Sequence, residues 1–161
     1  MNRTAVGAPL TTVAAHGLRV DLPQRWEARV YLRDATAGES ESINPVVHLG
    51  NFALPPRRGD YGSGAVEVMR AAHAFIALVE FGAAELDTPL FAAQGVPRPN
   101  VVDFAPNALQ RRLPGQLGMQ RFFTENGRTF CLYVVLGSAR FAAQLVGEVH
   151  DVLDHVAVES R

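Results

Sequence analysis

The sequence predicts an α+β fold, in which a single antiparallel β-sheet of about six strands carries a C-terminal helix on one face. Three observations lead to this prediction. Two apolar runs meet at Asn126-Gly127, apolar residues then recur at helical spacing, and shorter alternating segments lie earlier in the chain. Strands combined with one amphipathic helix are typical of α+β folds. A long irregular proline-rich excursion, residues 82–118, completes the prediction.

Length and composition fit one domain. The chain has 161 residues, of which 48% are hydrophobic and 19% charged, enough apolar material for a core. The net charge of −1 gives no general attraction to nucleic acid. No apolar run reaches the roughly 18–20 residues that a membrane span needs. We expect residues 1–15, which are small and polar, to form a flexible arm, and residues 16–161 to form a single domain.

The only cysteine and the N-terminal composition indicate a cytoplasmic protein. Cys131 alone cannot form an intramolecular disulfide or a cysteine-rich zinc site, and it lies within an apolar run. We therefore expect a buried, inert thiol. Pro9 and several threonines interrupt any signal-peptide apolar region. All 15 basic residues are arginine, which with abundant alanine and valine fits a bacterial genome of high G+C content.

The first half of the chain predicts four strands. Apolar and polar residues alternate over residues 18–22 and 26–32, which indicates a hairpin with one buried and one solvated face. Residues 45–54 form a third strand, and residues 75–81 a fourth that is apolar on both sides except for Glu80. Residues 65–71 suit one or two helical turns.

The late hairpin has the most specific signal. Asn-Gly between apolar runs favours a type I′ turn, because both central residues need a positive φ. The strands 119–124 and 129–136 then take a defined register, in which Phe123 faces Phe130 and Phe122 faces Cys131. Both faces of this strand pair are apolar, so we expect both to be covered.

One amphipathic helix follows over residues 139–154. Its apolar residues recur at helical spacing, and Ser138 is placed to cap it. One face of the sheet is its natural docking surface. Between the fourth strand and the hairpin, the excursion holds five prolines and little periodicity, with a short strand expected near residues 101–104.

Two candidate sites follow from isolated polar residues. Glu80 and Arg121 are each a lone charge in an apolar strand, and buried charges need partners, so we predict a structural ion pair between them. His150 and Asp154 on the helix are four residues apart, as are Asp151 and His155, and each pair can share a face. The two pairs point in different directions, whereas a closed metal site requires three or four convergent ligands. We expect a solvated helix end rather than a metal cluster.

The sequence shows no catalytic triad spacing, nucleophile elbow or dinucleotide fingerprint, and we assign no catalytic residue and no cofactor. The segment Leu-Pro-Gln-Arg-Trp26 after a short strand, the late hairpin, the helix and the closing Val-Ala-Val158 resemble the PsbP-like fold. That family includes extrinsic photosystem subunits, a Ran-binding import factor and bacterial lipoproteins. The resemblance implies a binding module rather than an enzyme.

We therefore expect a non-enzymatic interaction or structural domain. The alternative is a small-molecule-binding domain or an enzyme without recognisable motifs, with a pocket between the sheet and residues 82–118. A single helix covers one sheet face only, so the second apolar face predicts a homodimer.

Overall fold

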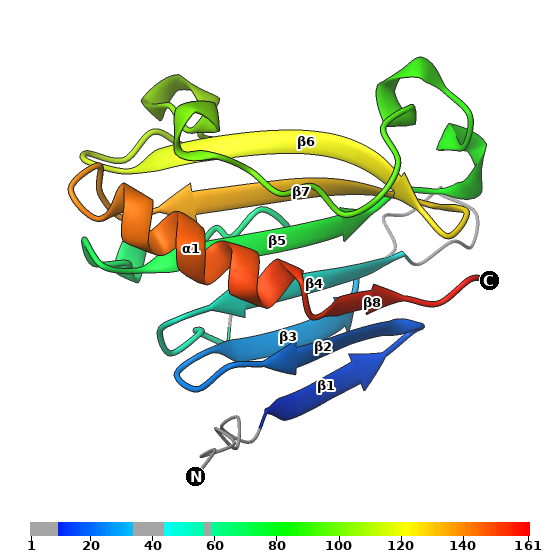
Figure 1. Cartoon of the computed structure of the whole chain (residues 1–161), viewed down its shortest axis with the longest axis horizontal. Coiled ribbons are helices and arrows are strands. Elements are labelled where there is room, and N and C mark those ends of the chain that lie inside the picture. Colours follow the sequence, from blue (N-terminus) through cyan, green and yellow to red (C-terminus); the bar gives the residue numbers. More distant parts are fainter. Residues whose placement is uncertain (1–9, 34–43, 57–58) are drawn as a thin grey trace, which may run out of the picture.

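The computed structural model describes residues 10–33, 44–56 and 59–161. In these residues, antiparallel strands form two sheets, and a helix lies near the C-terminus (Figure 1). The five-stranded sheet has the order β3 (Glu27–Leu32), β4 (Pro45–Gly50), β5 (Ala74–Glu80), β7 (Arg128–Leu136), β6 (Leu117–Glu125). The three-stranded sheet has the order β1 (Thr11–Ala15), β2 (Leu18–Leu22), β8 (Val156–Val158). The α+β class is confirmed, whereas the prediction of a single sheet is wrong.

Residues 11–15, which the sequence assigned to a flexible arm, form a strand. Thr11–Ala15 pairs with β2 as an antiparallel strand, and the first nine residues lie outside the described chain. The connection is a two-residue loop at His16 and Gly17, whose φ angles are 53° and 74°. Both positive φ values define the type I′ geometry that suits hairpins, and histidine is among the residues that tolerate it. The sequence did not predict this strand because its residues are small and show no apolar alternation.

The first two predicted strands exist, but they do not form a hairpin with each other. β2 pairs with β1 and β8, whereas β3 pairs with β4 in the other sheet. The turn between them leads the chain from one sheet to the other, and the Trp26 N–H donates to the Pro23 carbonyl at 3.3 Å. The predicted apolar residues of β2, with Ala28 and Val30 of β3, still pack into one shared core. The other face of β3 is not solvated as predicted, because Tyr31 packs against a second core, and Leu32 is 39% exposed.

The late hairpin has the predicted register. Phe123 pairs with Phe130 and Phe122 with Cys131, as expected. Asn126 and Gly127 have φ values of 48° and 72°, as a type I′ turn requires. Alternate residues of β7 point to opposite faces of the sheet, and each face packs into its own hydrophobic core.

The first core lies between the five-stranded sheet and a layer made of α1 (Ala142–Leu153) and the small sheet (Figure 1). Leu145, Val149 and Val152 of α1 are fully buried there. The helix begins three residues later than predicted, and the Ser138 hydroxyl accepts a hydrogen bond from the Phe141 N–H at 3.3 Å.

The second core covers the opposite face of the five-stranded sheet. Phe75, Cys131 and Tyr133 are buried there beneath two loop regions. One region is made of residues 51–56 and 59–73, which include the 3-10 helix η1 (Val66–Val68), and the other contributes Leu109 and Leu113. Every residue of β4, β5 and β7 is buried within one chain. The uncovered face that predicted a homodimer is therefore absent from the described chain, and the dimer itself stays a prediction.

The proline-rich excursion runs along the outer edge of β6 (Figure 1). It forms bridges from Gln94 to Thr124 and from Ala105 to Gly118. Its 3-10 helices are η2 (Ala83–Glu85), η3 (Pro89–Phe91), η4 (Val101–Asp103) and η5 (Pro106–Ala108). The strand expected near residues 101–104 is thus a 3-10 turn, because Asn100 and Asp103 form a capping box. The excursion protects a sheet edge from further pairing.

Candidate functional site

Glu80 is a buried charge in an apolar strand, as predicted, but its main partner is Arg128. Both side chains are 2% exposed. Arg128 Nε and Nη2 donate to the two Glu80 carboxylate oxygens at 2.9 and 2.7 Å. Arg161 adds a second contact, with Nη2 3.0 Å from Glu80 Oε1. The pairing of Glu80 with Arg121 is therefore wrong.

The strand register explains why. Arg121 lies opposite Leu132, whereas Glu80 lies opposite Phe130, and β7 separates their two strands. Arg121 instead reaches Asp103 of the excursion at 2.8 Å, and its side chain is 46% exposed. It stays near water because β6 is the last strand of the sheet.

The helix residues considered for metal binding have other partners. His150 Nε2 bonds the Pro99 carbonyl, and Asp154 pairs with Arg98, so both attach α1 to the excursion. His155 Nδ1 bonds the Asp151 carbonyl at 2.6 Å. The described residues contain no group of three or more His, Cys, Asp or Glu side chains placed to share a metal ion.

Cys131 is buried in the second core. Burial raises the pKa of its thiol to about 11, and burial also raises the pKa of Tyr61, a neighbour in that core, to about 12. A protonated, inaccessible thiol is a poor nucleophile, in agreement with the sequence prediction.

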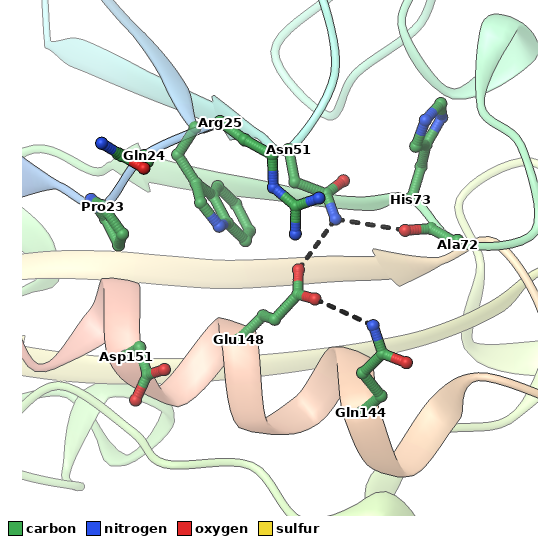
Figure 2. Close-up of a pocket in the computed structure, with 10 residues that line it drawn as sticks. Pro23, Gln24, Arg25, Asn51, Ala72, His73, Gln144, Glu148 and Asp151 are labelled. Carbon is green, nitrogen blue, oxygen red and sulfur yellow. Dashed lines mark hydrogen bonds between the residues drawn. The ribbon is translucent and has the colours of Figure 1, made fainter.

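A polar cleft lies where the β2–β3 turn, the ends of β4 and β5, and α1 meet. We call it the turn–helix cleft; its volume is about 330 Å³. Figure 2 shows how its side chains converge from separate segments of the chain. The lining residues are Pro23, Gln24, Arg25, Trp26, Asn51, Ala72, His73, Gln144, Glu148 and Asp151.

Arg25 has an unusual backbone conformation in this cleft. It is the third residue of the turn Pro23–Trp26, and its φ is 70°. Type II turns give that position to glycine or asparagine, because a side chain there is strained. Within the described part of the chain, no hydrogen bond or ion pair engages its guanidinium. The cleft is therefore lined by a guanidinium that no other group of the described chain neutralises.

Glu148 supplies the opposite charge from α1. Asn51 Nδ2 donates to one carboxylate oxygen at 3.0 Å, and Gln144 Nε2 donates to the other at 3.2 Å. Asn51 is held in turn, because its Nδ2 donates to the Ala72 carbonyl and its Oδ1 accepts from the Ala74 N–H. Neutral amides thus orient the carboxylate, and no arginine or histidine of the described chain pairs with it.

His73 forms one wall of the cleft. Its ring stacks on Phe52 with centroids 5.0 Å apart, and its Nδ1 accepts a hydrogen bond from the Arg70 N–H at 2.9 Å. Burial and the nearby Arg70 charge lower the pKa of His73 below its ordinary value of 6.5. The imidazole is thus kept neutral, with its proton on Nε2.

A second hollow, of about 550 Å³, lies between the end of the excursion and the start of β6. Arg112 is its one charged lining residue, beside Leu113, Leu117 and backbone of the Pro114-Gly115 turn. This is the region where the sequence placed an alternative pocket. It brings together fewer polar side chains than the turn–helix cleft does, so the cleft is the better candidate site.

Sequence reasoning did not find the cleft. Arg25 and Trp26 belong to the segment that carries the PsbP-like resemblance, yet no spacing links them to Asn51, His73 or Glu148. Arg25 lies between the two predicted strands, and nothing in the local pattern gives its charge a role. A non-glycine residue at a glycine position of a turn could have been a signal, but the turn type is not evident from Pro-Gln-Arg-Trp.

No family model, curated protein or solved structure matches this chain. The resemblance to the PsbP-like fold therefore stays a prediction. In the described residues, no helix has the length and apolar character that crossing a membrane requires.

Proposed function

We propose that this protein is a non-enzymatic binding domain that holds a small polar molecule in the turn–helix cleft. The observation that supports the proposal is the convergence of a free arginine, an oriented carboxylate and a tryptophan on one cavity. Ligand sites are concave and place a few polar groups around an apolar surface. A volume of about 330 Å³ lies at the small end of their range.

The cleft is supported by rigid elements. Asn51 ties the end of β4 to the start of β5 and to Glu148 on α1. Trp26 is 9% exposed and packs into the first core, so contacts with that core hold its ring in place. A preformed site loses little conformational entropy when a ligand binds.

Trp26 is the only tryptophan in the chain, so its fluorescence reports on this cleft alone. We expect a panel of small polar metabolites, screened by Trp26 fluorescence and thermal shift, to contain a ligand that changes both. Ala72→Phe should fill the cleft and abolish the response. Ala143→Phe, on an exposed position of α1 outside the cleft, is the matched control and should keep it.

Two results would reject the proposal. A ligand response that survives Ala72→Phe would place binding elsewhere. Turnover of any panel member, abolished by one polar substitution in the cleft, would make the protein an enzyme.

A second candidate is the interaction domain, including a homodimer, that the sequence suggests. Exposed apolar residues on the excursion favour it: Val102 is 90% exposed and Val101 43%. Sedimentation equilibrium at micromolar concentration tests the homodimer, since a monomer has a mass of 17.4 kDa.

A further inference from the structure

We infer that the ligand of the turn–helix cleft is a small zwitterion, which carries a carboxylate for Arg25 and an ammonium for Glu148. The free α-amino acids are the simplest members of this class. The inference rests on the proposed function and names the chemistry of its ligand.

The first step concerns the two charges. Arg25 and Glu148 line the same cleft with opposite charges, yet no ion pair joins them. Figure 2 shows the guanidinium of Arg25 and the carboxylate of Glu148 directed into the space beside Asn51. The backbone turn holds one charge, and two amides hold the other. A ligand with two opposite charges can meet both without displacing either.

The second step concerns the anionic end of the ligand. A guanidinium offers parallel N–H donors that match the two oxygens of a carboxylate. All donors of Arg25 are available, because no protein acceptor in the described chain uses them. The turn that leads the chain from one sheet to the other needs the φ of 70° at residue 25, but glycine would adopt it without strain, so the choice of arginine there is explained best by the position of its guanidinium.

The third step concerns the cationic end. An ammonium group has three donors and no acceptor, and it needs oxygen atoms around it. Glu148 and Asp151 stand one helical turn apart on α1, and both line the cleft. Each oxygen of Glu148 accepts a single amide hydrogen bond, so lone pairs remain for a ligand. The Trp26 ring adds an apolar surface that also attracts cations.

Matched ligands test this assignment. Trp26 fluorescence and calorimetry should be used with a free amino acid, its N-acetyl derivative, which lacks the cation, and its carboxamide, which lacks the anion. For at least one side chain among the 20 amino acids, we expect the free form to bind at least about tenfold more tightly than either derivative. Equal binding of a derivative would overturn the assignment.

Matched variants test the residues. Arg25→Gly removes the guanidinium and suits the backbone, so affinity for the free amino acid should fall at least about tenfold while the fold is kept. Arg112→Gln removes the same charge at the second hollow and should leave affinity unchanged. Glu148→Gln should abolish the preference for the free form over the N-acetyl form. Unchanged affinity in Arg25→Gly would overturn the inference.

The failure of this inference can be told from the failure of the proposed function. If neutral polyols or sugars bind with a Trp26 response that Ala72→Phe abolishes, the cleft is a ligand site, but the zwitterion assignment is wrong. If neither these compounds nor amino acids bind at millimolar concentration, both are wrong.

Discussion

Arg128 uses all five of its guanidinium N–H donors, and Glu80 accepts two of them. The other three bonds go to the backbone carbonyls of His16, Gly17 and Glu159 at 3.0, 3.2 and 3.2 Å. A single buried arginine therefore joins β5 and β7 of the large sheet to the β1–β2 turn and to the segment after β8. The two sheets are held together at this end of the molecule by charge-assisted hydrogen bonds.

Arg128→Met should be strongly destabilising. It leaves Glu80 buried without its main partner, and breaking a buried pair costs about 3–5 kcal/mol. Arg121→Met is the matched control, because the Arg121–Asp103 pair is partly exposed and worth at most about 1 kcal/mol. Urea denaturation measures both. Equal losses would show that Arg128 does not hold the sheets together.

A substitution at Gly17 tests the contact between the β1–β2 turn and Arg128. A Cβ at residue 17 would lie 2.6 Å from Arg128 Nη1, and the φ of 74° already disfavours a side chain. Gly17→Ala should therefore lower the free energy of unfolding by more than about 1 kcal/mol.

Gly147→Ala provides the control for that substitution. Gly147 is exposed on α1, and an alanine Cβ there would have no neighbour within 4 Å, so alanine should stabilise the helix by about 0.5–1 kcal/mol. Melting temperatures measure both variants. A shift in the same direction for Gly17→Ala and Gly147→Ala would contradict the role given to the contact between Gly17 and Arg128.

The comparison of Arg121 with Arg128 shows what the sequence can predict. Alternation within β6 and β7 places Phe123, Phe130 and Leu132 in the first core correctly, because side chains alternate and the Asn-Gly turn sets the register. The same alternation puts Arg128 on the face of Phe130. The sequence does not single out Arg128, because nothing local shows that the β1–β2 turn covers it.

The features that the sequence did not predict depend on contacts between segments far apart in the chain. The two-sheet arrangement depends on β8 pairing with β2, a closure across almost the whole chain. The cleft likewise combines the β2–β3 turn with residues 51, 73 and 148. No periodicity within one segment specifies such contacts, so the elements could be predicted but their assembly could not.

The Asn126-Gly127 turn makes a third prediction. Gly127 has a φ of 72°, and a Cβ there would have no neighbour within 4 Å, so a substitution meets backbone strain without steric contact. Gly127→Val should destabilise the protein by more than about 1 kcal/mol, because a β-branched residue avoids this region. Thermal unfolding followed by circular dichroism checks it. An unchanged melting temperature would contradict the type I′ assignment.

His73 predicts a dependence of stability on pH. Its pKa in the folded protein lies below 6.5, because burial and the Arg70 charge disfavour the imidazolium. As the pH falls, the unfolded chain therefore binds a proton at His73 at a higher pH than the folded chain does. The contribution of His73 is complete above about pH 6.5, and it declines from there down to the folded-state pKa.

His73→Asn should remove that part of the pH dependence. We expect the urea midpoint of the wild type to fall more between pH 7.5 and pH 5 than the midpoint of the variant does. His155→Asn, at an exposed position at the end of α1, is the matched control. Parallel pH profiles for the wild type and His73→Asn would refute the assignment.

Arg25→Gly should make the protein more stable, in contrast to most substitutions. A non-glycine residue in the left-handed region costs about 1 kcal/mol, and the Arg25 side chain makes no hydrogen bond or ion pair in the described chain to offset that cost. Urea denaturation measures the gain. Arg25→Lys keeps both the strained backbone and a cation, so its stability should match the wild type. If Arg25→Gly is less stable, the guanidinium contributes to the fold, and it is then not held free for a ligand. A gain in stability together with a loss of affinity would show that the turn sacrifices stability for binding.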